Sequence, residues 1–413
     1  MFFYGKILAR KPGANYPKPS LKRSLRAQML LFMAARMVLA TTIRMVYPFL
    51  TYFGRGLGLD LIAISQALTI RSVSGVFGPF IALVGDSRGR KTGMALGLSL
   101  FVMGVAFMTF RSSYPIFIVM LAMTLLGNFV YVPSMQAYLG DRVSYQRRGR
   151  VVGIVEFGWA FGFILGVPLV GFLIARFGWQ APFPFMTVAG LLVLATLIVL
   201  LPKDQKSSGD AVLIWDYLRK VFSFRPAVAC IILGVVIALA NEMVNVVFGV
   251  WMEEDFGVKI AALSVTAMVI GFSELGAEAL VSGFSDRIGK VRSVRIGLVC
   301  SVLAALALPW LGSNLPGALL GLVGIYITFE FTIVSSIPLI SEILPDARAT
   351  LLAVYIAALS LGRSMGDLLA PRLYLFGKML EGLPTILIVA LVSVVLNLSA
   401  LIVLKVVESR GLR

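Results

Sequence analysis

The chain has 413 residues, of which 59% are apolar and 14% charged, and its formal net charge is +17. Soluble domains are about 45–50% apolar and about 25% charged, so this composition excludes an ordinary soluble protein. A membrane-spanning helix needs roughly 20 apolar residues, and the chain holds enough of them for about twelve spans. Uninterrupted apolar runs such as 191–201 exclude an outer-membrane barrel, whose strands alternate apolar and polar residues.

Apolar runs predict an all-α membrane protein with twelve helical spans. The predicted spans are 27–53, 60–84, 92–110, 114–139, 151–175, 181–201, 227–251, 259–282, 293–312, 316–343, 349–376 and 384–406. Of the 37 Lys and Arg residues, 27 lie at the termini and in the loops on one side of this arrangement, and six on the other. The positive-inside rule therefore predicts a multi-pass protein of the cytoplasmic membrane with both termini in the cytoplasm.

Charged side chains inside spans are costly, so each is a candidate functional residue. The first half carries Arg36 and Arg44 in span 1, Arg71 in span 2 and Glu156 in span 5. Arg44 shares a helical face with Tyr47, and a proline follows that can break the helix beside a cavity. Arg44, Tyr47 and Arg71 are predicted to bind substrate or coupling ion, although Arg71 also suits a static pair with an acid. Arg36 lies nearer the cytoplasmic end, where it can snorkel.

Span 5 carries glycines at a spacing of four residues. Gly158, Gly162 and Gly166 form a ridge of small residues, which continues through Pro168 to Gly171. Such ridges permit close helix crossings, and the proline can bend the helix. We expect this ridge at a tight crossing where the two halves of the protein meet.

The longest polar stretch, 202–226, separates six spans from six. It predicts an N-terminal half over 1–202, a cytoplasmic linker over 203–226 and a C-terminal half over 227–413. Within the linker, residues 210–222 alternate apolar and charged side chains, which predicts an amphipathic helix at the membrane surface.

The second half carries five acidic residues and one basic residue inside its spans. Glu274 and Glu278 share a face of span 8. Two like charges in a low dielectric favour protonation of one of the two carboxyl groups, and a carboxyl that titrates near neutral pH is what a proton-coupled carrier needs. The alternative is that both are held in fixed ion pairs by arginines of the first half. Asp367 and Arg363, four residues apart, are expected to form a structural ion pair. The remaining candidates for substrate or proton binding are Asn128, Tyr131 and Glu156 in the first half, and Asn241, Glu242, Asn245 and Glu330 in the second.

Functional-type residues repeat at an offset of 200 positions. The matched pairs are Asp86 and Asp286, Gly89 and Gly289, Arg90 and Lys290, Arg148 and Arg348, Gly162 and Gly362, and Gly166 and Gly366. Parallel repeats of this kind build secondary transporters, in which the substrate site lies near the membrane midplane between the halves.

Two of these repeated segments carry the pattern of a known loop. Residues 85–91 read GDSRGRK and residues 286–292 read DRIGKVR. They resemble the cytoplasmic loop signature GxxxDRxGRK of the major facilitator superfamily, with Ala82 and Ser282 in place of the first glycine and Ser87 in place of the arginine. Span count, linker and repeat extend the resemblance over the whole chain.

The resemblance implies the fold and a conformational latch. The fold would be twelve transmembrane helices in two parallel-repeat six-helix halves. The latch, which would stabilise the outward-open state, comprises Asp86, Gly89, Arg90, Asp141, Arg148, Asp286, Arg287, Gly289 and Lys290. The alternative is that these charges only set the topology and that the aspartates cap helices. Span 5 resembles the motif of drug- and sugar-efflux-type permeases, although Val167 separates Gly166 from Pro168.

Missing motifs narrow the class further. The sequence has no histidine and no GxxxxGK[ST] pattern, and its two cysteines, Cys230 and Cys300, lie in apolar runs. A Ser-His-Asp triad, a zinc site and a nucleotide-hydrolysing loop are therefore not expected. We expect neither enzymatic activity nor a cofactor or metal.

These patterns favour a secondary active transporter that exports a small organic compound by alternating access, with protons as the coupling ion. The alternatives are a proton symporter or uniporter that imports a sugar, organic ion or amino acid, and a lipid flippase whose arginines hold a headgroup. The expected partners are the small-molecule substrate, protons and the lipid bilayer. We expect a monomer that does not bind nucleic acid.

Overall fold

The computed structural model describes residues 21–81, 89–202 and 214–411, and these residues form helices and turns without a strand. The first half comprises α1 (Leu21–Arg44), α2 (Leu50–Leu57), α3 (Leu61–Val76), α5 (Arg90–Phe110), α6 (Tyr114–Arg142), α7 (Tyr145–Phe161), the π-helix η1 (Gly162–Gly166), α8 (Val167–Phe177) and α9 (Pro182–Leu200). After α10 (Ile214–Ser223), the second half comprises α11 (Arg225–Asn245), α12 (Phe248–Phe256), α13 (Ile260–Ile288), α14 (Lys290–Leu311), α15 (Leu315–Ile343), the 3₁₀ helix η2 (Pro345–Ala347), α16 (Arg348–Lys378) and α17 (Leu387–Gly411).

Eleven spans among the described residues are long and apolar enough to cross a membrane, or twelve if the pair α2 and α3, bent by 109°, counts as one span. The all-α membrane fold that the sequence predicts is confirmed. Several helices are longer than the predicted spans. For example, α6 continues to Arg142 and α13 to Ile288. Polar residues that follow an apolar run can extend the helix beyond the lipid.

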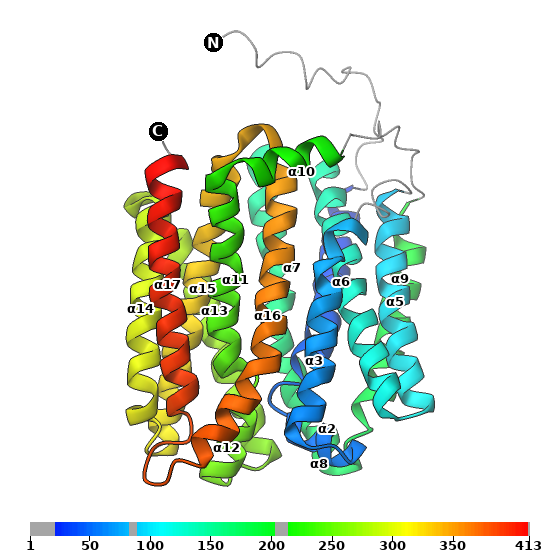
Figure 1. Ribbon diagram of the computed structural model, residues 1–413. Helices are drawn as coiled ribbons and strands as arrows, with labels where there is room; N and C mark the ends of the chain where they lie inside the picture. The colour runs from blue at the N-terminus through cyan, green and yellow to red at the C-terminus, as the bar shows by residue number, and fades with distance from the viewer. Residues whose placement is uncertain (1–20, 82–88, 203–213, 412–413) are drawn as a thin grey trace, which may run out of the picture.

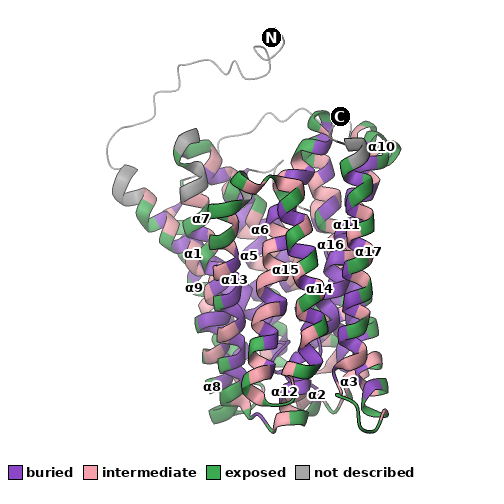
Figure 2. Ribbon diagram, turned by 90° about the vertical axis from the view of Figure 1, so that its left-hand side faces the viewer, coloured by how far each residue is buried: buried purple, intermediate pink, exposed green. Residues whose placement is uncertain are grey.

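The helices stand side by side as one bundle (Figure 1). The linker helix α10 and the end of α17 lie at one end of it, and α2, α8 and α12 lie at the other, which we call the α2/α12 end. Large apolar side chains such as Phe110 and Val199 are exposed on the outside of the bundle, while buried residues line the helix contacts (Figure 2). An apolar outer surface of this extent suits lipid contact.

The internal repeat of the sequence is also visible in the backbone structure of the two halves. In each half the first long helix is interrupted and followed by a short one, α1 by α2 and α11 by α12. Gly58 and Gly257 close the two short helices with φ angles of 70° and 62°, and Gly89 and Gly289 precede α5 and α14 with φ angles of 106° and 93°. These left-handed turns are accessible to glycine at little cost, which explains why the sequence repeats glycine there.

The most extensive contacts between the two halves are α3 against α16 and α8 with η1 against α13. Small residues allow the helices to approach closely at both contacts. A Cβ atom on Gly75 of α3 would lie 2.8 Å from Ser360 Oγ of α16, and one on Gly171 of α8 would overlap Ser264 of α13. The remaining space between the halves holds the candidate site. The boundaries of the predicted linker stay a prediction, because residues 203–213 lie outside the described ones.

Candidate functional site

A cavity of about 180 Å³ lies between the two halves. Its wall includes eight of the twelve residues predicted to bind substrate or coupling ion: Arg44, Tyr47, Arg71, Asn241, Glu242, Asn245, Glu274 and Glu330. Aromatic rings from both halves complete the wall, namely Phe129, Trp159, Phe163, Tyr326 and Phe329. Six charged side chains and two asparagines share the wall with these rings, so the cavity is more polar than the mostly apolar pockets that are typical of small-molecule sites.

A buried ion pair joins the halves across this cavity. Arg44 Nη1, at the end of α1, donates to Glu274 Oε2 of α13 at 2.6 Å, and both side chains are at most 8% exposed. The Arg44 guanidinium also lies 4.1 Å from the ring centroid of Trp159 and 4.3 Å from that of Phe163. The rings and the carboxylate together compensate the arginine's charge in a low dielectric.

Arg71 of α3 is held by neutral acceptors. Its Nη2 donates to the Tyr47 hydroxyl at 2.5 Å and its Nη1 to the Ile43 carbonyl oxygen at 3.3 Å, while its Nε is buried without a partner. Glu242 and Asp367 act on it electrostatically, but no ion pair forms among the described residues. The static acid pair considered for Arg71 is therefore absent from this conformation.

The expected ion pair between Arg363 and Asp367 is wrong. Asp367 is fully buried and accepts a hydrogen bond from Ser72 Oγ of α3 at 2.6 Å, whereas Arg363 lines the cavity. Helical spacing places two residues on one face but does not specify their partners. Asp367 lies at the contact of α3 and α16, where Ser72 of the other half supplies a closer donor.

A chain of hydrogen bonds fixes Glu242 in the cavity wall. Asn245 Nδ2 donates to Glu242 Oε1 at 3.1 Å, and the Tyr326 hydroxyl of α15 donates to Asn245 Oδ1 at 2.6 Å. The neighbouring Asn241 also lines the cavity, and its Oδ1 is buried without a partner. The two asparagines that flank Glu242 in the sequence therefore position polar atoms at the same wall.

Glu330 of α15 lines the cavity without a hydrogen bond or ion pair to any described residue. The charged groups that act on it are Arg44, Arg363, Glu274 and Glu278. Glu278, one turn after Glu274 on α13, is half-buried outside the cavity wall.

Four predicted residues do not line the cavity: Asn128, Tyr131, Glu156 and Glu278. Arg36 engages two of these, since its Nη1 donates to Asn128 Oδ1 at 3.0 Å and its Nη2 to Glu156 Oε2 at 2.5 Å. Gln136 donates to the other oxygen of Glu156 at 3.1 Å. The expected snorkelling of Arg36 is wrong, because its side chain is 7% exposed and forms this inward cluster. Tyr131 is buried with its hydroxyl unpartnered.

The loop residues form matching ion pairs in the two halves. Arg90 Nε lies 3.5 Å from Asp141 Oδ2, joining α5 to α6, and Lys290 pairs with Glu342, joining α14 to α15. Each pair therefore stays within its own half. Asp86 lies outside the described residues, as do the side chains of Arg148 and Asp286. Arg287 is exposed, and the latch role of these residues stays a prediction.

The glycine ridge of span 5 packs mainly within the first half. A Cβ on Gly162 would lie 2.7 Å from that of Ala40, and Cβ atoms on Gly158 and Gly166 would overlap Met33 and Thr41, all on α1. The expectation that the ridge lies between the halves is thus wrong for these three glycines and right for Gly171, which packs against Ser264 of α13. The helix changes to a π-helical turn over Gly162–Gly166 and continues into α8. Pro168 directly follows this turn and removes one N–H from the continuous helix.

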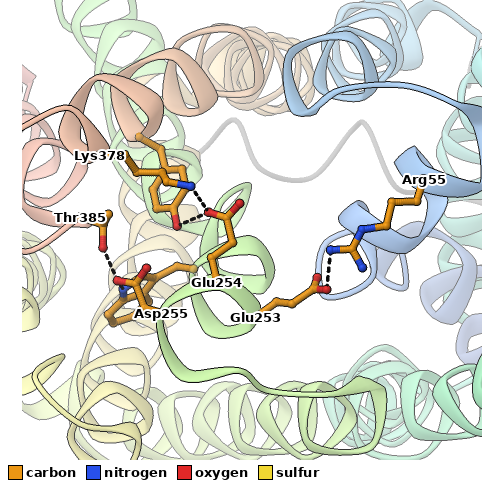
Figure 3. A network of polar contacts seen from close by, with 8 residues as sticks. Arg55, Glu253, Glu254, Asp255, Lys378 and Thr385 are labelled. Carbon is orange, nitrogen blue, oxygen red and sulfur yellow. Dashed lines mark hydrogen bonds and ion pairs between the residues drawn. The ribbon is translucent and has the colours of Figure 1, made fainter.

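A polar network joins helices at the α2/α12 end. Glu253 of α12 accepts a hydrogen bond from Thr51 of α2, in the other half. It also pairs with Arg55 Nη2 of α2 at 2.6 Å (Figure 3). The next residue, Glu254, pairs instead with Lys378 Nζ of α16 at 3.0 Å, within its own half. Adjacent acids therefore attach α12 to both halves at once.

The contacts of Glu253 lead to a prediction about how often the α2/α12 end opens. In Glu253→Gln, the amide can still accept from Thr51, but the attraction to Arg55 is lost. Because Arg55 is 63% exposed, the pair contributes at most about 1 kcal/mol, so the open fraction of this end is expected to rise up to about fivefold. Spin labels at the exposed positions Asp60 and Lys259, in a variant lacking the native cysteines, would report the distance across this end.

The matched control is Glu381→Gln, an exposed acid in the turn between α16 and α17. It removes the same charge near the same end without touching the contact between α2 and α12. A distance distribution that is unchanged in Glu253→Gln, or equally changed in both variants, would contradict a gating role for Glu253.

The sequence pattern missed several residues of the site. Arg363 was assigned to a structural pair, and Phe163 and Tyr326 carry no signal that separates them from the many aromatic residues of the spans. Glu342 had a signal, because it lies 201 residues after Asp141, close to the repeat offset. Glu253 stands in an acidic run whose partners only the folded structure shows.

The two-half helical bundle with a central polar cavity is the architecture of a membrane transporter. The sequence model described as Major Facilitator Superfamily matches residues 32–367, and the chain belongs to this family. The predicted family and fold are therefore confirmed, and the protein is a multi-pass membrane transporter.

Individual relatives are distant. The uncharacterized MFS-type transporter YwfA of Bacillus subtilis is 26% identical over 345 residues, covering 80% of this chain and 81% of that protein. Multidrug resistance protein MdtG of Klebsiella pneumoniae is 26% identical over 248 residues, covering 56% and 57%. A solved bacterial homolog of the human lysosomal transporter Spinster, inward-facing and occupied, has a TM-score of 0.74 at 14% identity, covering 94% and 98%. That structural likeness shows the shared fold alone.

Proposed function

We propose that this transporter exports a small organic solute in exchange for protons, with both termini in the cytoplasm. The observation that carries the proposal is Glu330, a carboxyl group in the cavity wall without a partner among the described residues. Such a group can gain and lose a proton as the cavity changes its exposure, which is the exchange that proton coupling requires.

The contacts between the halves support alternating access. The Arg44–Glu274 pair and the Glu253 contacts both join the first half to the second. They must rearrange if the halves rock about the cavity, so the charges of the site are coupled to its conformation. A ligand or proton that alters these charges can then bias which end opens.

Export is supported by one relative and by the sequence of span 5. With the termini in the cytoplasm, the α2/α12 end faces outward. MdtG is named for multidrug resistance, which is consistent with export. The glycine-rich span 5 adds the resemblance to efflux-type permeases.

The proposal predicts how a single carboxyl group controls coupling. Proteoliposomes with an acidic interior and an internal pH indicator would be given lipophilic cations, sugars and organic acids in turn. In the wild type, a transported compound is expected to dissipate the pH gradient. Glu330→Gln is expected to abolish this proton movement while labelled substrate still exchanges by counterflow, because the amide keeps the size of the side chain but cannot titrate.

The matched control is Glu408→Gln, since Glu408 is an exposed glutamate of α17 that pairs with Arg295 at 2.5 Å, outside the cavity wall. It should retain wild-type proton movement. Retained proton movement in Glu330→Gln would exclude Glu330 as the coupling site. Counterflow without proton movement in the wild type would exclude antiport and favour a uniporter.

A further inference from the structure

The cavity wall leaves one acid and one base without partners. Glu330 on α15 and Arg363 on α16 both line it, both are half-buried, and neither forms a hydrogen bond or ion pair with any described residue. They do not pair with each other, although Arg363 is among the charges that act on Glu330. Two opposite charges therefore line one cavity without forming an ion pair.

The other charged groups of the wall have hydrogen-bond partners. Arg44 forms an ion pair with Glu274, whereas Arg71 donates to the neutral Tyr47 and Glu242 accepts from the neutral Asn245. The wall contains three arginines and three glutamates, so its formal charge is zero. A ligand therefore enters a neutral cavity in which one negative and one positive group remain available.

The chemistry of these two groups is complementary. The planar guanidinium of Arg363 can donate two parallel hydrogen bonds to a carboxylate, and the carboxylate of Glu330 can accept from an ammonium group. Phe329, next to Glu330 in the sequence, and Phe129 of the other half add aromatic surface to the same wall. Aromatic faces accommodate an apolar body and attract a nearby cation.

We propose that the cavity binds a small zwitterion, with its ammonium group on Glu330, its carboxylate on Arg363 and its apolar body against Phe129 and Phe329. A cation or an anion would compensate one of these two charges and leave the other half-buried and unpaired, which costs part of its hydration. The inference rests on the proposed function, because an ammonium group and a proton then compete for Glu330, as antiport requires.

The test compares molecules that share one body and differ only in charge. Phenylalanine, phenethylamine and 3-phenylpropionate form one such series, and tryptophan, tryptamine and indole-3-propionate form a second. Binding to the purified protein in nanodiscs, without a pH gradient, would be measured by calorimetry. In at least one series the zwitterion is expected to bind about tenfold or more tightly than both singly charged members.

Two variants separate the two contacts. In Glu330→Gln the zwitterion should lose its advantage over the anion, and in Arg363→Gln it should lose its advantage over the cation. Glu408→Gln and Arg295→Gln remove the same charges from an exposed pair outside the cavity and should preserve both preferences. The thermal unfolding midpoint of each variant would show that it is folded, and Glu330→Asp and Arg363→Lys would retain the charges if a glutamine variant is not.

Preference for either singly charged member, absence of binding by both series, or an advantage that survives both variants would overturn the zwitterion site. Because this measurement uses no gradient, it can fail while proton-coupled flux is observed with another compound. In the same way, a zwitterion that binds and exchanges without proton movement would retain the site and reject the coupling.

Discussion

Glu274→Gln is expected to abolish transport and to lower the free energy of unfolding by about 3–5 kcal/mol, because it leaves the Arg44 guanidinium buried without its carboxylate. Arg44 and Glu274 are only 7% and 8% exposed, so the lost carboxylate leaves the guanidinium largely shielded from bulk solvent. The cation–π contacts with Trp159 and Phe163 offset part of the loss. Unfolding in detergent and flux in proteoliposomes would measure the two effects.

The double variant Arg44→Gln, Glu274→Gln isolates the pair. It should be more stable than Glu274→Gln alone, because no uncompensated charge remains, yet it should still fail to transport. The exposed pair of Arg295 and Glu408 is the reference, and breaking it should cost less than about 1 kcal/mol. The single variant Arg44→Gln completes the comparison. If the double variant loses as much free energy of unfolding as the two single variants together, Arg44 and Glu274 act independently and their ion pair does not stabilise the contact between the halves.

The fold could be predicted because lipid constrains it strongly. A spanning segment must satisfy its backbone internally, so apolar length alone identifies helices such as α9 and α17. The repeat was visible because Gly89 and Gly289 adopt the same left-handed turn, which other residues rarely occupy. Helix ends were less predictable, since polar residues continue α13 to Ile288 without any apolar signal.

The candidate site could be predicted in composition but not in pairing. Buried charges are costly, so Arg44, Arg71 and Glu330 stood out from the sequence, and all three line the cavity. Their partners depend on which helices are neighbours, and helical periodicity carries no such information. For this reason Asp367 binds Ser72 instead of Arg363, and Glu156 turns to Arg36, away from the cavity wall.

Adding one methyl group to α16 should test whether its distance from α11 matters for the site. Gly362 of α16 lies against α11, where an added Cβ would overlap the carbonyl oxygen of Val235. In Gly362→Ala the two helices must separate, which should lower the free energy of unfolding by about 1–3 kcal/mol. The separation would also displace Glu242, which Gly366 contacts one turn later, so flux should fall together with stability.

The control for this variant is Gly153→Ala in α7, where nothing lies within 4 Å of the added Cβ. Alanine favours a helix over glycine by up to about 1 kcal/mol, so this variant should be as stable as the wild type or slightly more stable. Thermal unfolding and flux of both variants would be compared in the same preparation. Equal stability of the Gly362→Ala and Gly153→Ala variants would mean that α16 can move away from α11 at little cost in free energy. The position of Glu242 in the cavity wall would then not depend on this helix contact. A loss in Gly362→Ala alone would show that the close contact between α11 and α16 sets the position of that carboxylate.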